Sequence, residues 1–224
     1  MSCKIERLLL DLYMPDNLKS YLKEGVVLHR NDREAGLLLQ LSDGRAVKLF
    51  PAKGMVLGWF RDVLKQTKAH KQWNSAQKVL AVGLKTPEPL SVEVFSPNSE
   101  YESAYIYRYL EEAQTFLDFF NESENRSELL ADLARQIALM AREDVLVIDL
   151  HLSNLLVDDE GQIWWIDLEI TGNKRLIRKK FWQRIERMHM KCNPGVLTAL
   201  EFNQFREELD RYLPVDLQRK SGNL

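Results

Sequence analysis

The sequence contains little cysteine and lacks the segments that carry a chain into or across a membrane. Its two cysteines, Cys3 and Cys192, have neither metal-site spacing nor the number needed for a disulfide framework, which is typical of a reducing cytoplasm. Near the start there is only the short apolar run 8–10 before Asp11, so we predict no signal peptide. No apolar stretch is long enough to span a membrane. We therefore expect a cytoplasmic protein.

The chain also lacks a strong excess of either charge. Its formal net charge is −2, and 29% of its 224 residues are charged while 45% are hydrophobic. This balance excludes a generally basic nucleic-acid coat, so we expect no nucleic acid among the partners. A chain of this length and composition can bury a good core as one domain or as two small lobes. It contains no internal repeat and no low-complexity segment.

A pattern of two acids and one amide around two apolar strands is the most informative feature present. Asp149 stands five residues before Asn154, and Asp167 ends the second strand of a predicted hairpin over 155–166. The hairpin turn carries Asp and Gly between apolar strands, so we expect it to bring the two acids to one edge. Phosphoryl transfer uses such a set, with one carboxylate orienting the attacking hydroxyl and oxygen ligands holding magnesium. The alternative is a surface hairpin whose Asp and Asn side chains merely cap turns.

A lysine upstream adds to this interpretation. Lys48 lies among apolar neighbours in the predicted strand 46–50, after the turn at Asp43-Gly44. A lysine placed in this way can contact the α- and β-phosphates of a nucleotide. The alternative is an edge-strand lysine that discourages aggregation.

The expected elements follow one another in the order found in protein kinases. A helical lead-in over 1–24 precedes strands at 26–28, 37–41 and 46–50, a helix at 55–82, strands at 90–95 and 101–110, and helices at 115–121 and 127–142. We expect Ser127 to cap the last of these helices, with Leu130, Leu133, Ile137 and Met140 on its apolar face. Trp73, Trp164 and Trp165 are interpreted as packing residues.

The chain resembles the bacterial lipopolysaccharide core kinases, the heptose and Kdo kinase family of the protein-kinase-like superfamily. The resemblance covers roughly residues 25–190 and rests on Ala46-Val-Lys48, Lys71-Gln-Trp73-Asn-Ser-Ala76 with Thr86-Pro-Glu-Pro89, Tyr105-Ile-Tyr-Arg-Tyr-Leu110, Asp149-Leu-His-Leu-Ser-Asn154 and Ile166-Asp-Leu-Glu169. It implies an α+β, two-lobed fold with an N-lobe over 1–110, built on a small antiparallel sheet, and a reduced, mainly helical C-lobe over 111–224.

The same resemblance implies ATP and Mg²⁺ as cofactors. Lys48 and Asp149 would be catalytic, Asn154 and Asp167 would bind the metal, and the nucleotide would also contact Gln72, Tyr109 and Leu110. His151, inside the predicted catalytic loop, is not expected to take the proton.

Four departures from the kinase pattern keep a catalytically inactive binding module open. Val147 stands where kinases usually carry His, and Gln72 stands where a Glu paired to the strand lysine is expected. An amide brings no charge to that pairing, so Lys48 would be held less firmly. The metal turn is Asp-Leu-Glu rather than Asp-Phe-Gly, and the segment 25–36 contains no G-x-G-x-x-G loop.

A strongly basic segment follows the predicted metal turn. Within residues 173–191 there is a single acid, Glu186, against eight cations: Lys174, Arg175, Arg178, Lys179, Lys180, Arg184, Arg187 and Lys191. Clustered cations attract phosphates and anionic headgroups, and Phe181 and Trp182 would add apolar contact at an interface. We therefore expect an anionic acceptor or membrane surface here; the alternative is a solvated helix face.

The short remainder of the chain bears on the acceptor. Only 57 residues follow Asp167, and they include no Ala-Pro-Glu segment, so a sugar or glycolipid acceptor is favoured over a polypeptide. We therefore predict an ATP- and magnesium-dependent phosphotransferase that acts on a sugar hydroxyl of lipopolysaccharide core or a related glycolipid, peripheral at the inner face of the membrane. The alternatives are a small atypical protein kinase and a scaffold module.

Overall fold

The computed structural model describes residues 15–31, 36–52, 67–96, 99–191 and 196–219. The chain divides into two compact units, with Met1–Ala76 and Pro87–Glu111 in unit 1 and Gln77–Thr86 and Glu112–Leu224 in unit 2. The predicted N-lobe over 1–110 therefore differs from unit 1 mainly at residues 77–86. Two hydrogen bonds tie these residues to unit 2: the Trp165 amide donates to the Lys85 carbonyl (2.9 Å), and the Thr86 hydroxyl donates to the Trp165 carbonyl (2.7 Å).

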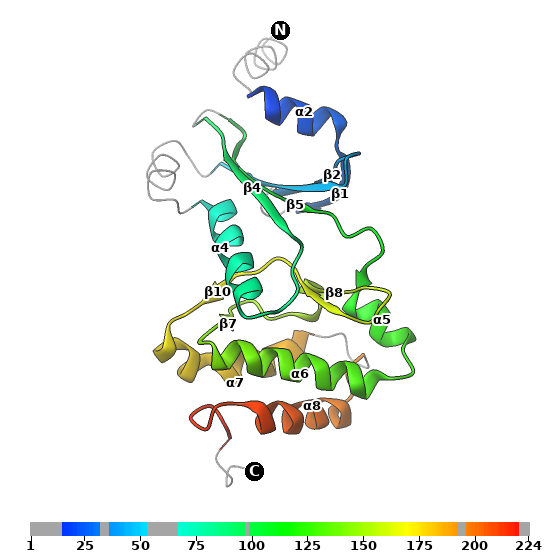
Figure 1. The fold of residues 1–224 in the computed structure, drawn as a ribbon, viewed down its shortest axis with the longest axis vertical. Coiled ribbons are helices and arrows are strands. Elements are labelled where there is room, and N and C mark those ends of the chain that lie inside the picture. The colour runs from blue at the N-terminus through cyan, green and yellow to red at the C-terminus, as the bar shows by residue number, and fades with distance from the viewer. Residues whose placement is uncertain (1–14, 32–35, 53–66, 97–98, 192–195, 220–224) are drawn as a thin grey trace. The chain divides into compact units, whose positions relative to one another are not determined.

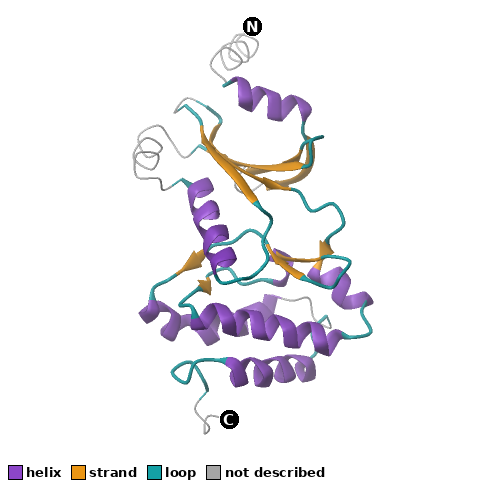
Figure 2. Ribbon diagram, viewed as in Figure 1, coloured by secondary structure: helices purple, strands orange, loops and turns teal. Residues whose placement is uncertain are grey.

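Unit 1 is built on a five-stranded antiparallel sheet (Figures 1 and 2). The strands are β1 (Val26–Asn31), β2 (Gly36–Gln40), β3 (Arg45–Pro51), β4 (Pro89–Val94) and β5 (Tyr101–Arg108), in the spatial order β1-β2-β3-β5-β4. Burial alternates along β2, where Leu37 and Leu39 face the core, as expected of a half-buried strand. Gly44 turns β2 into β3 with φ of +78°, which an L side chain rarely adopts. The strands predicted at 26–28, 37–41 and 46–50 are confirmed, and each pairs with the next in antiparallel fashion.

Two helices accompany this sheet. The described part of the lead-in is α2 (Asp16–Glu24), which buries Leu18 and Tyr21 among the sheet's apolar residues. The described part of the next predicted helix is α4 (Lys68–Ala81), whose Trp73 packs with Phe50 and Tyr105, so its interpretation as a packing residue is confirmed. Residues 1–14 and 55–66, which the two predictions also included, lie outside the described part of the chain.

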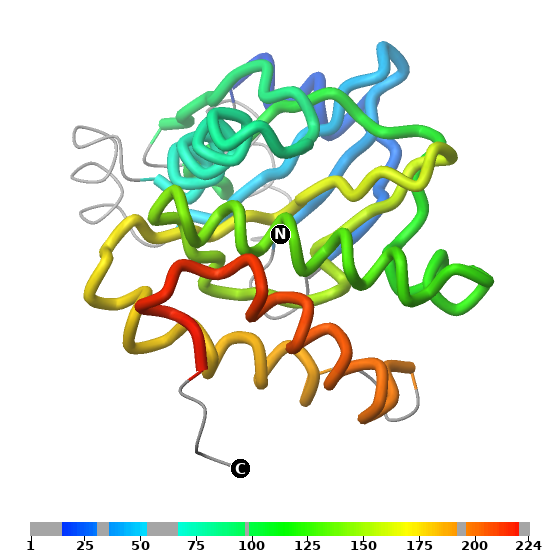
Figure 3. The backbone as a smooth tube through the Cα atoms, turned by 60° about the horizontal axis from the view of Figure 1, so that its bottom comes forward, coloured from blue at the N-terminus to red at the C-terminus, as the bar shows by residue number. Residues whose placement is uncertain are grey.

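Unit 2 is mainly helical. It contains α5 (Phe116–Glu122), α6 (Arg126–Arg142), α7 (Lys174–Lys191), α8 (Ala199–Tyr212), the 3₁₀ helix η1 (Leu152–Asn154), and the short strands β6 (Gln114–Thr115), β7 (Leu146–Val147), β8 (Leu155–Val157), β9 (Ile163–Trp165) and β10 (Ile170–Thr171). Helices α6 and α8 lie side by side (Figures 1 and 3). The four apolar residues predicted for α6 are all buried in one core with Trp165. The predicted α+β fold class is confirmed.

One predicted helix start is wrong. Helix α6 begins at Arg126, after Asn125, and Ser127 is not its N-cap. The reason lies in tertiary structure, because the Arg126 guanidinium pairs with Glu201 of α8 at 3.0 Å and lies over the Phe120 ring. These contacts hold Arg126 in the first turn.

Among the described residues, no helix has both the length and the apolar content to cross a bilayer.

Candidate active site

The segment that carries Asp149 is anchored by a short pair of strands in unit 2. Strand β7 pairs with β10, so that Val147 lies opposite Ile170. The Ile148 amide then donates to the Glu169 carbonyl at 2.7 Å, which extends the pairing to the residue before Asp149. Asp149 is exposed, while Leu150 and Leu152 beyond it are buried. The apolar neighbours therefore fix the loop and leave the carboxylate accessible.

Asn154 ties the loop to the predicted metal turn. Its side-chain amide donates from Nδ2 to the Asp149 carbonyl at 3.1 Å. Its own carbonyl accepts from the Ile166 amide at 3.0 Å. Since Ile166 directly precedes Asp167, two hydrogen bonds connect Asp149, Asn154 and the Asp167 turn. The structure thus links Asn154 to the backbones of Asp149 and Ile166, while the catalytic and metal-binding roles of the three residues stay predictions.

Asp167 has an unusual backbone conformation. Its φ is +50°, and among the described non-glycine residues only Asp144 is likewise positive. Residues held in this left-handed region cost on the order of 1 kcal/mol and persist where their surroundings fix them. Here the next residue, Leu168, is buried and Asp167 itself is exposed. The turn therefore directs a carboxylate outward from a fixed backbone.

The hairpin turn is held by an acid with a structural role. Asp158 accepts from the backbone amides of Glu160 and Gln162, and its second oxygen accepts from Trp164 Nε1 at 2.7 Å. Burial raises the pKa of Asp158, but these hydrogen bonds and the nearby Lys85 outweigh it and leave that pKa below its ordinary value. Asp158 therefore caps the hairpin turn, while the roles of Asp149, Asn154 and Asp167 stay predictions. Of the two tryptophans in β9, Trp165 is a core residue as predicted, whereas Trp164 is only partly buried.

A cation from α7 lies directly beside Asp149. Lys191 Nζ is 2.8 Å from Asp149 Oδ1, although the two residues are 42 positions apart. This hydrogen bond is the main cause that lowers the pKa of Asp149; burial opposes it, and the charges of Lys191, His151 and Arg187 add to it. We did not predict this pairing. The only sequence indication was the position of Lys191 at the end of the basic run.

His151 has a structural partner within the loop. Its Nδ1 accepts from the Ser153 backbone amide at 3.2 Å and lies 2.6 Å from the Ser153 hydroxyl. The ring therefore caps η1. Burial lowers the pKa of His151, the charge of Lys191 lowers it further, and Asp149 opposes both. That His151 does not take the proton stays a prediction.

The nucleotide-contact residues predicted upstream all lie in unit 1. Lys48 is in β3, opposite Leu38 of β2 and Tyr105 of β5, with Nζ 5.6 Å from the centre of the Phe50 ring. Gln72 is a partly buried residue of α4. Tyr109 and Leu110 follow β5, and the Tyr109 amide donates to the Gly44 carbonyl at 2.9 Å. Lys48 is thus in a central strand, so the edge-strand alternative is wrong. The nucleotide roles of these residues stay predictions.

The predicted metal ligands fit a magnesium ion in chemical type. Among the described residues, no group of three His, Cys, Asp or Glu side chains could hold a metal by itself. Magnesium, however, is usually held by one or two carboxylates together with water and substrate phosphates. Asn154 uses its amide nitrogen on the Asp149 carbonyl, which leaves the side-chain oxygen as its acceptor. That oxygen and the Asp167 carboxylate are hard donors of the kind magnesium prefers.

Helix α7 shows that the basic segment has distinct faces. Its buried side consists of Ile177, Phe181, Ile185 and Met188. The expectation that Phe181 adds interfacial contact is wrong, because it is 1% exposed and packs in the core. Trp182 is partly buried and donates to the Leu217 carbonyl. Phe181 thus belongs to the core of unit 2, and Trp182 packs against that core.

One row of cations on α7 ends with Lys191, the residue that contacts Asp149. Spacings of four, three and four residues place four side chains on one side of the helix. We call this row the basic stripe; it consists of Lys180, Arg184, Arg187 and Lys191.

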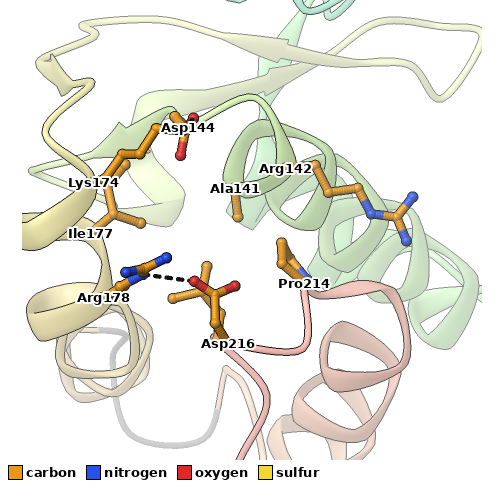
Figure 4. A pocket seen from close by; sticks show the side chains of 9 residues that line it. Ala141, Arg142, Asp144, Lys174, Ile177, Arg178, Pro214 and Asp216 are labelled. Carbon is orange, nitrogen blue, oxygen red and sulfur yellow. Dashed lines mark hydrogen bonds and ion pairs between the residues drawn. The ribbon is translucent and has the colours of Figure 1, made fainter.

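At the other end of α7, two cations serve the fold. A pocket of about 220 Å³ lies where α6, α7 and the segment after α8 meet (Figure 4). In it Arg178 pairs with Asp216 at 2.7 Å, and Lys174, also part of the lining, pairs with Asp144 at 2.7 Å. These ion pairs connect the start of α7 to its neighbours.

Comparison with known proteins places these features in a family. The chain is 21% identical over 154 residues to the 3-deoxy-D-manno-octulosonic acid kinase of Vibrio cholerae serotype O1. This match covers 64% of this chain and 61% of that protein. It is 23% identical over 160 residues to the protein of the same name from Vibrio vulnificus, covering 65% and 67%. The chain thus spans about three fifths of the Vibrio cholerae protein.

Solved structures similar to this chain include a crystal structure of WbdD. It has 16% sequence identity and a TM-score of 0.47, and the match covers 86% of this chain and 47% of that one. A second structure, described as the bifunctional kinase-methyltransferase WbdD, has 14% identity and a TM-score of 0.44. The model of the lipopolysaccharide kinase (Kdo/WaaP) family matches residues 21–208. Since that match takes in most of the sequence, the chain belongs to the Kdo/WaaP lipopolysaccharide kinase family.

Proposed function

We propose that the protein transfers the γ-phosphoryl group of ATP to a hydroxyl of 3-deoxy-D-manno-octulosonic acid, a sugar acid, carried on a lipopolysaccharide core or a related glycolipid. The observation that supports this most is the hydrogen-bonded set of Asp149, Asn154 and the Asp167 turn in a member of the Kdo/WaaP family. The curated relatives named above carry this sugar acid in their names.

Each residue of the set would have a distinct role. Asp149 would accept a hydrogen bond from the acceptor hydroxyl and receive its proton as the oxygen bonds to the γ-phosphorus. The bond between that phosphorus and the β,γ-bridging oxygen breaks, and ADP leaves. Asn154 and Asp167 would hold Mg²⁺, and Lys48 would contact the α- and β-phosphates. When bound, magnesium neutralises charge on the phosphates. Gln72, Tyr109 and Leu110 would complete the nucleotide contacts.

The basic stripe would serve a glycolipid acceptor at an anionic membrane surface. Among the described residues, Lys180, Arg184 and Arg187 form no ion pair with an acid. Such cations attract anionic headgroups and phosphates by about 1 kcal/mol each near the surface. We therefore extend the proposal to peripheral association with the inner face of the membrane through this stripe.

Phosphate transfer to a defined acceptor tests the function. Purified protein is incubated with ATP, Mg²⁺ and a lipid A that carries 3-deoxy-D-manno-octulosonic acid, and the mass of the product is measured by mass spectrometry. We expect the mass of one added phosphate, and none with Asp149→Ala. ATP binding without transfer to this acceptor, and without autophosphorylation, would favour the scaffold alternative. Phosphate on the protein alone would favour the protein kinase.

A further inference from the structure

The contact between Lys191 and Asp149 differs in its partner from the ion pairs that Lys174 and Arg178 form at the start of α7. The pairs of Lys174 and Arg178 join the helix to parts of unit 2 that have no predicted role in catalysis. Lys191 instead contacts the carboxylate predicted to receive the acceptor hydroxyl. The Lys191 side chain is 30% exposed and the Asp149 side chain 54% exposed, so solvent or a ligand can reach both. An exposed pair of this kind adds little stability, commonly below about 1 kcal/mol.

The surroundings of Lys191 supply further positive charge at the same place. Arg187 lies one turn earlier on the same side of α7, is exposed, and forms no ion pair among the described residues. Its positive charge is one of those that lower the pKa of the Asp149 carboxyl. Lys191 and Arg187 thus form the end of the basic stripe that adjoins the reacting group.

An anionic acceptor needs such cations at this point. Asp149, Asp167 and Glu169 are all exposed acids of the predicted catalytic segment. A sugar with its own carboxylate would be repelled by these groups, by about 1 kcal/mol for each exposed charge at about 4 Å in water, unless a cation offset that charge. Lys191 is already within hydrogen-bond distance of the carboxylate that the acceptor hydroxyl must approach. A small movement of its flexible side chain would let Nζ contact a second carboxylate.

We propose that Lys191 and Arg187 form the subsite that binds the carboxylate of the sugar acid next to Asp149. Lys191 donates to Asp149 when no acceptor is bound and to the acceptor carboxylate when it is. The acceptor hydroxyl then takes the place of Lys191 at Asp149. This inference rests on the proposed function, and it explains how an acidic segment admits an acidic acceptor.

Two small acceptors and a matched set of variants test the subsite. The acceptors are the methyl glycoside of 3-deoxy-D-manno-octulosonic acid and its methyl ester, which has no carboxylate charge and, like the acid, no phosphate. We expect wild type to show a KM about tenfold higher for the ester, because a charge-assisted hydrogen bond is lost. Lys191→Met should raise the KM for the acid by a similar factor and leave that for the ester unchanged. In both cases kcat should stay within about threefold.

Further variants separate charge recognition from a general effect on α7. Lys191→Arg should recover most of the affinity for the acid, and Arg187→Gln should raise its KM by a smaller factor. Lys174→Met is the matched control, because it also removes one Lys–Asp pair from α7, at the opposite end of the helix from Lys191. It should leave both KM values unchanged. A lowered kcat with unchanged KM in Lys191→Met would overturn the proposal and make Lys191 a residue that positions Asp149. Equal use of acid and ester would also overturn it.

Failure of the proposed function can be distinguished from failure of the subsite. If wild type transfers no phosphate to either glycoside, binding of both is measured by ligand-observed NMR. If the acid binds and the binding is weakened both by esterification and by Lys191→Met, the subsite is upheld even though the proposed reaction is not. Equal binding of the two glycosides, or none, would overturn it.

Discussion

Asp149 has two carboxylate oxygens, and the structure assigns one of them a partner. Lys191 contacts Oδ1, while Asn154 fixes the backbone carbonyl of the same residue. The carboxylate is thus positioned from two sides without being buried. Its proposed role concerns the acceptor hydroxyl. Removing the carboxylate should therefore slow the chemical step and leave the affinity for ATP unchanged.

Asp149→Ala should lower kcat by at least about a hundredfold, since positioned acid–base groups contribute about 10²–10⁴. The dissociation constant for ATP should stay nearly the same, because other residues hold the phosphates. Transfer to acceptor and equilibrium binding of ATP measure the two quantities separately. An unchanged melting temperature would verify that the variant folds. Retained turnover would mean that the catalytic loop lies elsewhere.

Asp167→Asn isolates a charge at a special backbone position. Asn tolerates a φ near +50° at least as well as Asp, so the variant should fold with the same turn. It loses the carboxylate that would bind magnesium. We expect ATP to stabilise wild type against heat more with Mg²⁺ than without it, and the difference to vanish in the variant. If wild type shows the same ATP-induced shift with and without Mg²⁺, the metal assignment is wrong.

At the scale of elements, long amphipathic segments were predictable and short strands were not. The apolar spacing in α6 and the alternation in β2 are local patterns, and both elements lie where the sequence indicated. Strands β7 and β10 have two residues each and exist because they pair with each other across the catalytic segment. No local period marks such a strand. The start of α6 was missed for the same reason, because Arg126 is held by a residue of α8.

The candidate site divides in the same way. Asp149, Asn154 and Asp167 could be found because their spacing around a hairpin is encoded locally. The contact between Lys191 and Asp149 depends on the direction in which α7 leaves β10 and on which of its sides packs inward. A run of eight cations does not reveal which one reaches Asp149, and burial of Ile177, Phe181, Ile185 and Met188 decides it.

The attachment of α2 can be tested through Tyr21. Its hydroxyl donates to Glu93 of β4 at 2.8 Å, and the residue is 7% exposed. Tyr21→Phe should lower the free energy of unfolding at pH 8 by about 1.5–3 kcal/mol, the usual value for a hydrogen bond to a charged group. Urea unfolding measures this. A loss below about 0.5 kcal/mol would mean that the bond contributes little.

The same pair gives a pH dependence with a definite sign. Burial, followed by the hydrogen bond and charge of Glu93, raises the pKa of Tyr21 from 10.0 to about 12. Because the folded pKa lies above the unfolded one, this contribution is fully present below pH 10 and is lost between pH 10 and 12. The difference in unfolding free energy between wild type and Tyr21→Phe should therefore shrink by roughly 1 kcal/mol from pH 8 to pH 11. A constant difference would contradict the raised pKa.

The core side of α7 provides a stability test with a control in the same helix. Phe181 is 1% exposed in the core of unit 2, whereas Met190 is 82% exposed. Phe181→Ala should cost about 3–5 kcal/mol of unfolding free energy, as expected when a large buried ring is removed. Met190→Ala should change it by less than about 0.5 kcal/mol. If the two variants lose similar stability in urea, α7 does not pack as the structure describes.

At the scale of the whole molecule, the distribution of charge matters more than its sum. The net charge is −2, yet α7 carries eight of the 31 Lys and Arg residues. The fold uses some of these in ion pairs and aligns others in the basic stripe. A general attraction to anions would involve all exposed cations of α7 alike. The stripe predicts instead that one side of the helix dominates, because a helix is about 10–12 Å across and exposed charges are screened over about 10 Å at 0.1 M salt.

Vesicle binding distinguishes these two cases. The double variant Lys180→Gln and Arg184→Gln should bind vesicles containing anionic lipid about thirtyfold more weakly than wild type at 0.1 M salt, since each lost cation removes about 1 kcal/mol. The double variant Arg175→Gln and Lys179→Gln removes the same charge from another side of α7 and should lose much less. Wild-type binding should weaken as salt rises and be absent on zwitterionic vesicles. Equal losses in the two double variants would show a nonspecific attraction. Wild-type binding that salt does not weaken would rule out an electrostatic membrane contact through α7.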